Sequence, residues 1–373
     1  MLRSSSCPPR APRVVRAVVS SSLVGLLVLG LACSGGAPEP TEWVFPVWQE
    51  ERLGFINQAG DLVIEPQFLG SLEASDDIVP VLADLGEDQL WGFVDFSGAW
   101  VVEPRFGRIG PFAEGRAAFL DEDRLRGGYI DRTGEVVIEP IFEATRRFAG
   151  GVAAVKVQGL WGYLDPAGDL AIEPRFQRSR DFAEGLAMVG MADGTIGYID
   201  RQGAWVVEPR PKRGSAPGPS QVEGELNGRP VRQALTEGYN FSEGLAAVRV
   251  EDGTWGFLDT EGKWVIEPRF FGAGLFSEGL APIRIGLRWG YVDRNGDVVI
   301  EAHFHNVKKF ALGLAPVKVP DQGWGFINAE GEVVLEPVYQ GAEPFVHGLA
   351  SVQVGSRWGY IDPQGRTVWE PSR

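Results

Sequence analysis

A repeat of about 34 residues runs through most of this 373-residue chain and limits the folds that it can adopt. In the copy at residues 255–268, which reads WGFLDTEGKWVIEP, the second position is a glycine. Nine copies share this glycine: Gly54, Gly92, Gly128, Gly162, Gly197, Gly256, Gly290, Gly325 and Gly359. Eleven residues later each copy has a glutamate: Glu65, Glu103, Glu139, Glu173, Glu208, Glu267, Glu301, Glu336 and Glu370. Residues 43–373 therefore form a single array of nine units and not several separate domains.

Each unit has the sequence pattern of a β-hairpin followed by a third strand. Asp259 opens a turn that Gly262 closes, because an aspartate side chain caps turn amides and glycine adopts the left-handed conformation. The runs on either side are short and rich in β-prone residues. We expect the Glu-Pro pair to end the second strand, since proline cannot donate to a ladder. Residues 245–250 supply the third strand, and the glycine of the Trp-Gly pair lets the backbones of successive units approach closely.

These motifs resemble the WG (KWG) β-repeat family of bacterial proteins. The resemblance covers residues 43–373, although Leu53, Gly127 and Ile196 replace the tryptophan in three units. It implies an all-β repeat architecture, and it implies no common reaction or ligand.

We expect nine three-stranded units stacked as an open β-solenoid or superhelix, because no strand is left over to complete the last unit. The alternative is a closed ring resembling a β-propeller, which short blades would allow at this length. A second motif, Phe276-Ser277-Glu278-Gly279, recurs in seven units, but the first unit diverges and keeps only Val79-Pro80-Val81. One step of 59 residues places a loop insertion within 211–238.

The first 32 residues predict an export signal. Four arginines precede an apolar stretch from Ala17 to Ala32, as in a signal peptide. The following Leu29-Gly30-Leu31-Ala32-Cys33 resembles the lipobox of bacterial lipoproteins, with Gly30 where that family favours leucine. We therefore expect Cys33 to carry a lipid and residues 33–42 to form a flexible tether. Cleavage after Ser34, giving a soluble secreted or periplasmic protein, and a retained single-span anchor are the alternatives.

Charge excludes one class of partner. The chain has 35 Lys+Arg against 50 Asp+Glu and a net charge of −15. Removing the signal takes away four arginines, which leaves 31 basic residues and a net charge of −19. Nucleic-acid binding needs a clustered cationic surface, so we expect none. We also expect no cofactor and a monomer.

The tryptophans are the candidate ligand contacts. Four lie in the second strand and would stack on sugar rings if they were exposed: Trp100, Trp205, Trp264 and Trp369. The alternative interpretation is that these tryptophans pack in the hydrophobic core and contact no ligand. His303 and His305 lie two residues apart on a strand, but no third ligand is signalled, so we predict no metal site. The motif glutamates are interpreted as structural, capping amides or pairing with the arginine that follows.

No catalytic motif is present, so we predict a non-enzymatic lipoprotein of the bacterial cell envelope that is held to the membrane only by its N-terminal lipid. Its array would be an interaction scaffold for a protein partner of unknown identity. The competing hypothesis is a module that binds cell-wall glycan or exopolysaccharide, and the third is an unrecognised envelope enzyme.

Overall fold

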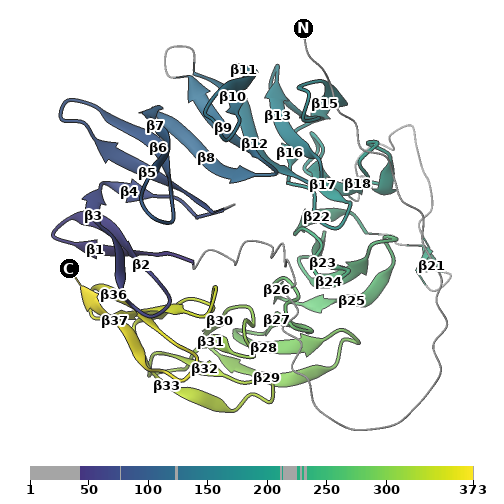
Figure 1. The fold of residues 1–373 in the computed structure, drawn as a ribbon. Coiled ribbons are helices and arrows are strands. Elements are labelled where there is room, and N and C mark those ends of the chain that lie inside the picture. Colours follow the sequence, from purple (N-terminus) through teal and green to yellow (C-terminus); the bar gives the residue numbers. More distant parts are fainter. Residues whose placement is uncertain are drawn as a thin grey trace, which may run out of the picture. The chain divides into compact units, whose positions relative to one another are not determined.

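The computed structural model is a ring of small β-sheets (Figure 1). The structure describes residues 43–75, 77–121, 125–210, 212, 225–226, 229–230 and 233–372. The predicted signal peptide, Cys33 and the tether lie outside these residues. Residues 41–373 form one compact unit, and all the regular structure described in it is β-strand. Among the described residues no helix is long and apolar enough to span a membrane.

Nine sheets, here called blades 1–9, follow one another along the chain. Blade 1 has three strands and the other eight have four, always in sequential order and antiparallel. Their bounds are β1 (Phe45–Gln49), β2 (Arg52–Ile56) and β3 (Leu62–Phe68) in blade 1; β4 (Gly70–Ser71), β5 (Ile78–Asp84), β6 (Gln89–Asp95) and β7 (Trp100–Phe106) in blade 2; β8 (Arg108–Ala113), β9 (Arg116–Asp121), β10 (Arg126–Ile130) and β11 (Val136–Phe142) in blade 3; β12 (Ala144–Ala149), β13 (Val152–Val157), β14 (Leu160–Leu164) and β15 (Leu170–Phe176) in blade 4; and β16 (Arg178–Ser179), β17 (Ala187–Gly190), β18 (Ile196–Ile199) and β19 (Trp205–Val207) in blade 5.

The second half of the chain continues the pattern after the insertion. The bounds are β22 (Leu235–Gly238), β23 (Leu245–Val250), β24 (Trp255–Asp259) and β25 (Trp264–Phe270) in blade 6; β26 (Gly272–Ala273), β27 (Leu280–Ile285), β28 (Arg288–Asp293) and β29 (Val298–Phe304) in blade 7; β30 (Asn306–Val307), β31 (Ala315–Lys318), β32 (Trp324–Ile327) and β33 (Val333–Tyr339) in blade 8; and β34 (Gly341–Ala342), β35 (Ala350–Val354), β36 (Arg357–Ile361) and β37 (Thr367–Ser372) in blade 9. Within the insertion, β20 (Glu225–Leu226) pairs with β21 (Arg229–Pro230), and the last residues of the predicted insertion form the inner strand β22.

The hairpin turn behaves as its sequence predicts. Asp259 accepts backbone hydrogen bonds from Glu261 (2.9 Å) and Lys263 (2.8 Å) through one carboxylate oxygen. The prediction that Glu-Pro ends the second strand is wrong, because β25 runs on through Glu267 and Pro268 to Phe270 with a bulge. This strand is the outermost of its blade (Figure 1), where proline leaves no ladder bond unmade.

Two predictions about the array need correction. Each unit contributes four strands rather than three, since a short inner strand precedes the third predicted strand in eight blades. The open solenoid is also wrong, and the alternative, a propeller-like ring, is the fold observed. Blades 1 and 9 share no strand. The ring closes through side-chain packing, in a cluster that contains Phe45, Val47 and Ile56 of blade 1 and Leu349 of blade 9.

Candidate functional site

An aromatic pair fills most of the interfaces between blades. In the four-stranded blades, the strand that carries the Trp-Gly pair is the third. Its Phe or Tyr meets the Phe of the Phe-Ser-Glu-Gly motif in the next blade, as Phe257 meets Phe276 at 5.0 Å between ring centroids. Seven interfaces have such a pair at 4.6 to 5.2 Å: Phe93–Phe112, Tyr129–Phe148, Tyr163–Phe182, Tyr198–Phe241, Phe257–Phe276, Tyr291–Phe310 and Phe326–Phe345. We call the second member of each pair the plug.

Among the residues that the structure describes, no such pair is found at the two interfaces that flank blade 1. In blade 2 the plug position is Ala74, as the matching registers show: Gly70 and Ser71 pair with the next strand as Gly272 and Ala273 do in blade 7. The bridge between Ser75 and Ile78 likewise repeats the one between Ser277 and Leu280. Phe55 therefore has no plug opposite it. Tyr360 of blade 9 contacts Phe45 instead, at 5.6 Å between ring centroids.

A cavity of about 580 Å³ lies where these plugs are missing, and we call it the joint cavity. Aromatic rings make up much of its wall: Trp43, Phe45, Phe55 and Tyr360. Ala74, Val79 and Leu349 add aliphatic surface from blades 2 and 9. The volume and the mostly apolar lining fit the general description of a ligand pocket.

A hydrogen bond and a pair of stacked rings connect blade 9 to blade 1 beside the cavity. The Tyr360 hydroxyl donates to the carbonyl of Pro46 at 3.0 Å, and burial raises the pKa of that hydroxyl to about 12, so it stays a donor. The imidazole of His347 stacks on the indole of Trp43 at 3.5 Å between centroids and 8° between planes. Burial lowers the pKa of His347, and the nearby Glu73 acts in the opposite direction.

The mouth of the cavity is acidic. Glu73 of blade 2 and Glu343 of blade 9 both line the cavity and are exposed. Glu343 forms an ion pair with Lys308 of blade 8, with 2.5 Å between the Nζ and Oε1 atoms. The arrangement therefore joins an apolar interior to carboxylates at the opening, which suits an apolar side chain flanked by positive charge.

The four tryptophans predicted as ligand contacts lie in four different blades. Trp264 is 8% exposed and Trp100 is 37% exposed, whereas Trp205 and Trp369 are half-buried. Trp100 and Trp205 pack edge-on against the phenylalanine that ends the outer strand of the preceding blade, at 5.9 and 5.8 Å. The structure brings none of the four to the joint cavity.

The motif glycines and glutamates have structural positions. All nine glycines are buried. A Cβ on Gly256 would lie 2.5 Å from the carbonyl oxygen of Ile266, so the close approach occurs within one hairpin rather than between units. Eight of the nine glutamates are exposed on the outer strands and Glu208 is partly exposed. The arginine that follows has a different partner from the one predicted, since Arg175 donates to the carbonyl of Gly203 in the next blade at 2.6 Å.

No metal site accompanies the two adjacent histidines in the part of the chain that the structure describes. His303 and His305 are both exposed, and the ring of His303 lies against Phe304 at 3.9 Å between centroids. Across those residues, no group of three histidine, cysteine, aspartate or glutamate side chains is placed to hold a metal ion.

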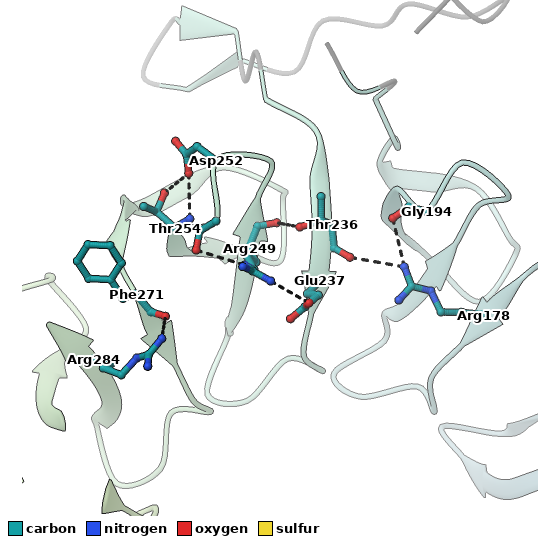
Figure 2. Close-up of polar contacts among 10 residues, drawn as sticks. Arg178, Gly194, Thr236, Glu237, Arg249, Asp252, Thr254, Phe271 and Arg284 are labelled. Atoms are coloured by element: carbon teal, nitrogen blue, oxygen red, sulfur yellow. Dashed lines mark hydrogen bonds and ion pairs between the residues drawn. The ribbon is translucent and has the colours of Figure 1, made fainter. Parts of the chain in front are cut away.

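Among the polar contacts drawn beside the insertion, one connects blade 5 to blade 6 and the others lie within a single blade (Figure 2). Arg249 donates to Glu237 at 3.0 Å and to the carbonyl of Gly253 at 3.2 Å. Arg178 donates to the carbonyls of Gly194 at 3.2 Å and Thr236 at 3.5 Å. Both arginines therefore have hydrogen-bond partners within the ring, which indicates a structural role for them.

The sequence contains one signal for the cavity, which is the change of motif in blade 2. The loss of the Phe-Ser-Glu-Gly motif around Ala74 reads as divergence of one unit. Only the ring shows that Ala74 faces Phe55 and lies near Tyr360 from the other end of the chain.

The comparisons with known proteins agree with the repeat and the ring. A family model described as "WG containing repeat" matches residues 54–68, 91–123, 128–161, 161–193, 255–286, 289–319 and 324–358. Among curated proteins, none matches the chain.

Several solved structures are similar in fold. A crystal structure described as a eukaryotic initiation factor is 10% identical, with 88% of this chain and 95% of that chain covered at a TM-score of 0.56. BamB from Moraxella catarrhalis is 14% identical over 83% of this chain and 92% of that one, with a TM-score of 0.41. The computationally designed Ika8 protein is 14% identical over 81% and 98%, with a TM-score of 0.44. At 10% identity the likeness to the initiation factor concerns the fold alone.

Proposed function

The chain belongs to the family of WG-repeat proteins, and we propose that its ring is a non-enzymatic interaction scaffold that binds a protein partner at the joint cavity. The observation that carries this proposal is the cavity itself. Seven interfaces are filled by an aromatic plug, and the two beside blade 1 leave about 580 Å³ lined by aromatic rings. Exposed apolar concavities of this kind are common sites of association.

The proposal includes a location. A basic, apolar N-terminus followed by Cys33 in a lipobox-like context supports export and lipid attachment in the bacterial cell envelope. Intact-mass spectrometry of the mature protein tests this point. An acyl mass on Cys33 is the expected result, whereas a free Cys33 or a chain that begins at Gly35 contradicts it.

Partner capture from the native envelope tests the proposed function. Ala74→Phe restores the plug and fills the cavity, so we expect the captured partner to be lost. Ala192→Phe adds the same side chain at an exposed turn of blade 5 and is the matched control. An unchanged set of captured proteins in Ala74→Phe contradicts binding at the cavity.

A glycan-binding module is the second candidate, because Trp100 exposes 37% of its surface on an outer strand. Saturable binding of isolated cell-wall polymer that Trp100→Ala abolishes and Ala74→Phe leaves unchanged would favour glycan over a protein partner.

A further inference from the structure

We propose that the joint cavity binds an aromatic side chain of the partner, presented by a segment that carries basic residues immediately before that aromatic residue. This inference rests on the proposed function and specifies the chemistry of its ligand. It follows from what the ring places at the same position in its other blades.

The aromatic part follows from the plug that is missing at Ala74 and from the aromatic rings that line the cavity there. Each of the other seven interfaces buries a phenylalanine against a Phe or Tyr of the preceding blade, in tilted or edge-on geometry. Phe55 and Tyr360 are the corresponding receptors beside blade 1, and both line the cavity. Phe55 is only 1% exposed, whereas Tyr360 is partly exposed, so a phenylalanine from outside would meet Tyr360 as the plug Phe310 meets Tyr291 at 4.9 Å.

The basic part follows from the charges at the mouth. Glu73 is exposed and lines the cavity, and the whole chain has a net charge of −15, whereas Glu343 is already paired with Lys308. Blade 8 shows how the ring itself combines these features: its plug is Phe310, and Lys308 and Lys309 precede it. Lys308 reaches Glu343 at 2.5 Å, so a cation two residues before a plug pairs with an acid on the next blade.

A peptide copied from blade 8 is therefore a suitable probe. A capped synthetic peptide with the sequence of residues 306–312 is titrated into the full mature protein by isothermal calorimetry. We expect saturable binding at one site. Replacing the phenylalanine of the peptide by alanine should weaken binding by about tenfold or more, as for a buried aromatic anchor. Replacing both lysines by glutamate should weaken it strongly at low salt and less at high salt.

Variants of the ring complete the test. Ala74→Phe should abolish peptide binding, Ala192→Phe should leave it unchanged, and Glu73→Gln should weaken it. Circular dichroism and thermal melting check that Ala74→Phe folds, and the smaller Ala74→Leu provides the same test if it does not.

Three results would overturn the inference. The first is peptide binding that is insensitive to Ala74→Phe and Ala74→Leu. The second is absence of peptide binding while envelope capture is still lost in Ala74→Phe, which keeps the proposed function but rejects this ligand chemistry. The third is self-association of the mature protein in sedimentation velocity that Ala74→Phe removes, which makes a second copy the occupant.

Discussion

At the residue scale, the strict glycine of the Trp-Gly pair is explained by the bulge of the outer strand. A Cβ at Gly256 would lie 2.5 Å from the Ile266 oxygen and 2.7 Å from the Pro268 nitrogen, both backbone atoms that cannot swing away. The sequence predicted a close approach but assigned it to neighbouring units. Periodicity reveals that a glycine is required, whereas the register shift that brings Ile266 over it appears only in three dimensions.

Substituting this glycine should therefore destabilise the ring. We expect Gly256→Ala to lower the free energy of unfolding by about 2–4 kcal/mol, because the outer strand must move to admit a methyl group. Urea denaturation followed by tryptophan fluorescence measures the change. Gly70→Ala is the control, since the nearest atom to its added Cβ is 4.0 Å away, and it should change stability by less than about 0.5 kcal/mol. Equal effects of the two substitutions would contradict the steric explanation.

His347 makes the stability of the ring depend on pH. Although the residue is exposed, partial desolvation of its imidazole lowers its pKa in the folded protein, so the unfolded chain binds more protons near the ordinary value of 6.5. The stabilising contribution is present above pH 6.5 and is lost as the pH falls from there through the folded pKa. We expect the melting temperature to fall from pH 7 to pH 5.5, and to fall less in His347→Asn. Asparagine suits the positive φ of 47° at this position.

Turn aspartates whose pKa is lowered, such as Asp95, titrate at more acidic pH than His347, which separates their effect on stability from that of His347. Hydrogen bonds from Ser97, Ala99 and Gly98 outweigh the opposing effect of burial and lower the pKa of Asp95 below 3.8, so its contribution is lost only at more acidic pH. If the melting temperature falls equally in wild type and in His347→Asn between pH 7 and pH 5.5, His347 is not the group that causes the fall.

At the element scale, the hairpin was predictable and the inner strand was not. The Asp-x-x-Gly turn and the β-prone runs beside it have local causes that a sequence shows directly. The inner strand is two residues long in most blades, as in Gly272–Ala273, so it has no alternation to detect. Its pairing is set by the ring rather than by its own composition.

The turn after the inner strand also ties blades together through a carboxylate. Glu278 accepts hydrogen bonds from the backbone N–H groups of Leu312 (2.8 Å) and Gly313 (2.9 Å) in the next blade. Glu243 makes the same contacts to Glu278 and Gly279. The second motif thus has a role between units that its sequence did not indicate.

Removing one such carboxylate should loosen one interface. We expect Glu278→Ala to lower the free energy of unfolding by about 1–2 kcal/mol, since two charge-assisted bonds are lost at a solvent-exposed position. Chemical denaturation measures it. Glu267→Ala, on the exposed face of an outer strand, is the matched control and should have little effect. The idea fails if both glutamates prove equally dispensable.

At the scale of the whole molecule, the sequence predicted nine units but not their closure. Closure depends on the small rotation between successive units, which no motif residue encodes alone. Because no strand is left over to complete the last unit, the sequence favours an open end. In the structure, side chains such as Phe45 and Leu349 close the ring instead, and the place of the missing plugs becomes a cavity.

A ring closed in this way should be least stable at its joint. In the part of the chain that the structure describes, the interfaces on both sides of blade 1 have no aromatic pair of the kind found at the other seven, so β1 should open before β24 of blade 6. Hydrogen exchange followed by mass spectrometry should show protection about tenfold lower in β1 than in β24, because a tenfold difference corresponds to only about 1.4 kcal/mol. Ala74→Phe should raise the protection of β1 and leave that of β24 unchanged, since the added ring packs on Phe55. Uniform protection around the ring, or no response of β1 to Ala74→Phe, would show that closure is as firm as the other interfaces and that the cavity is not its weak point.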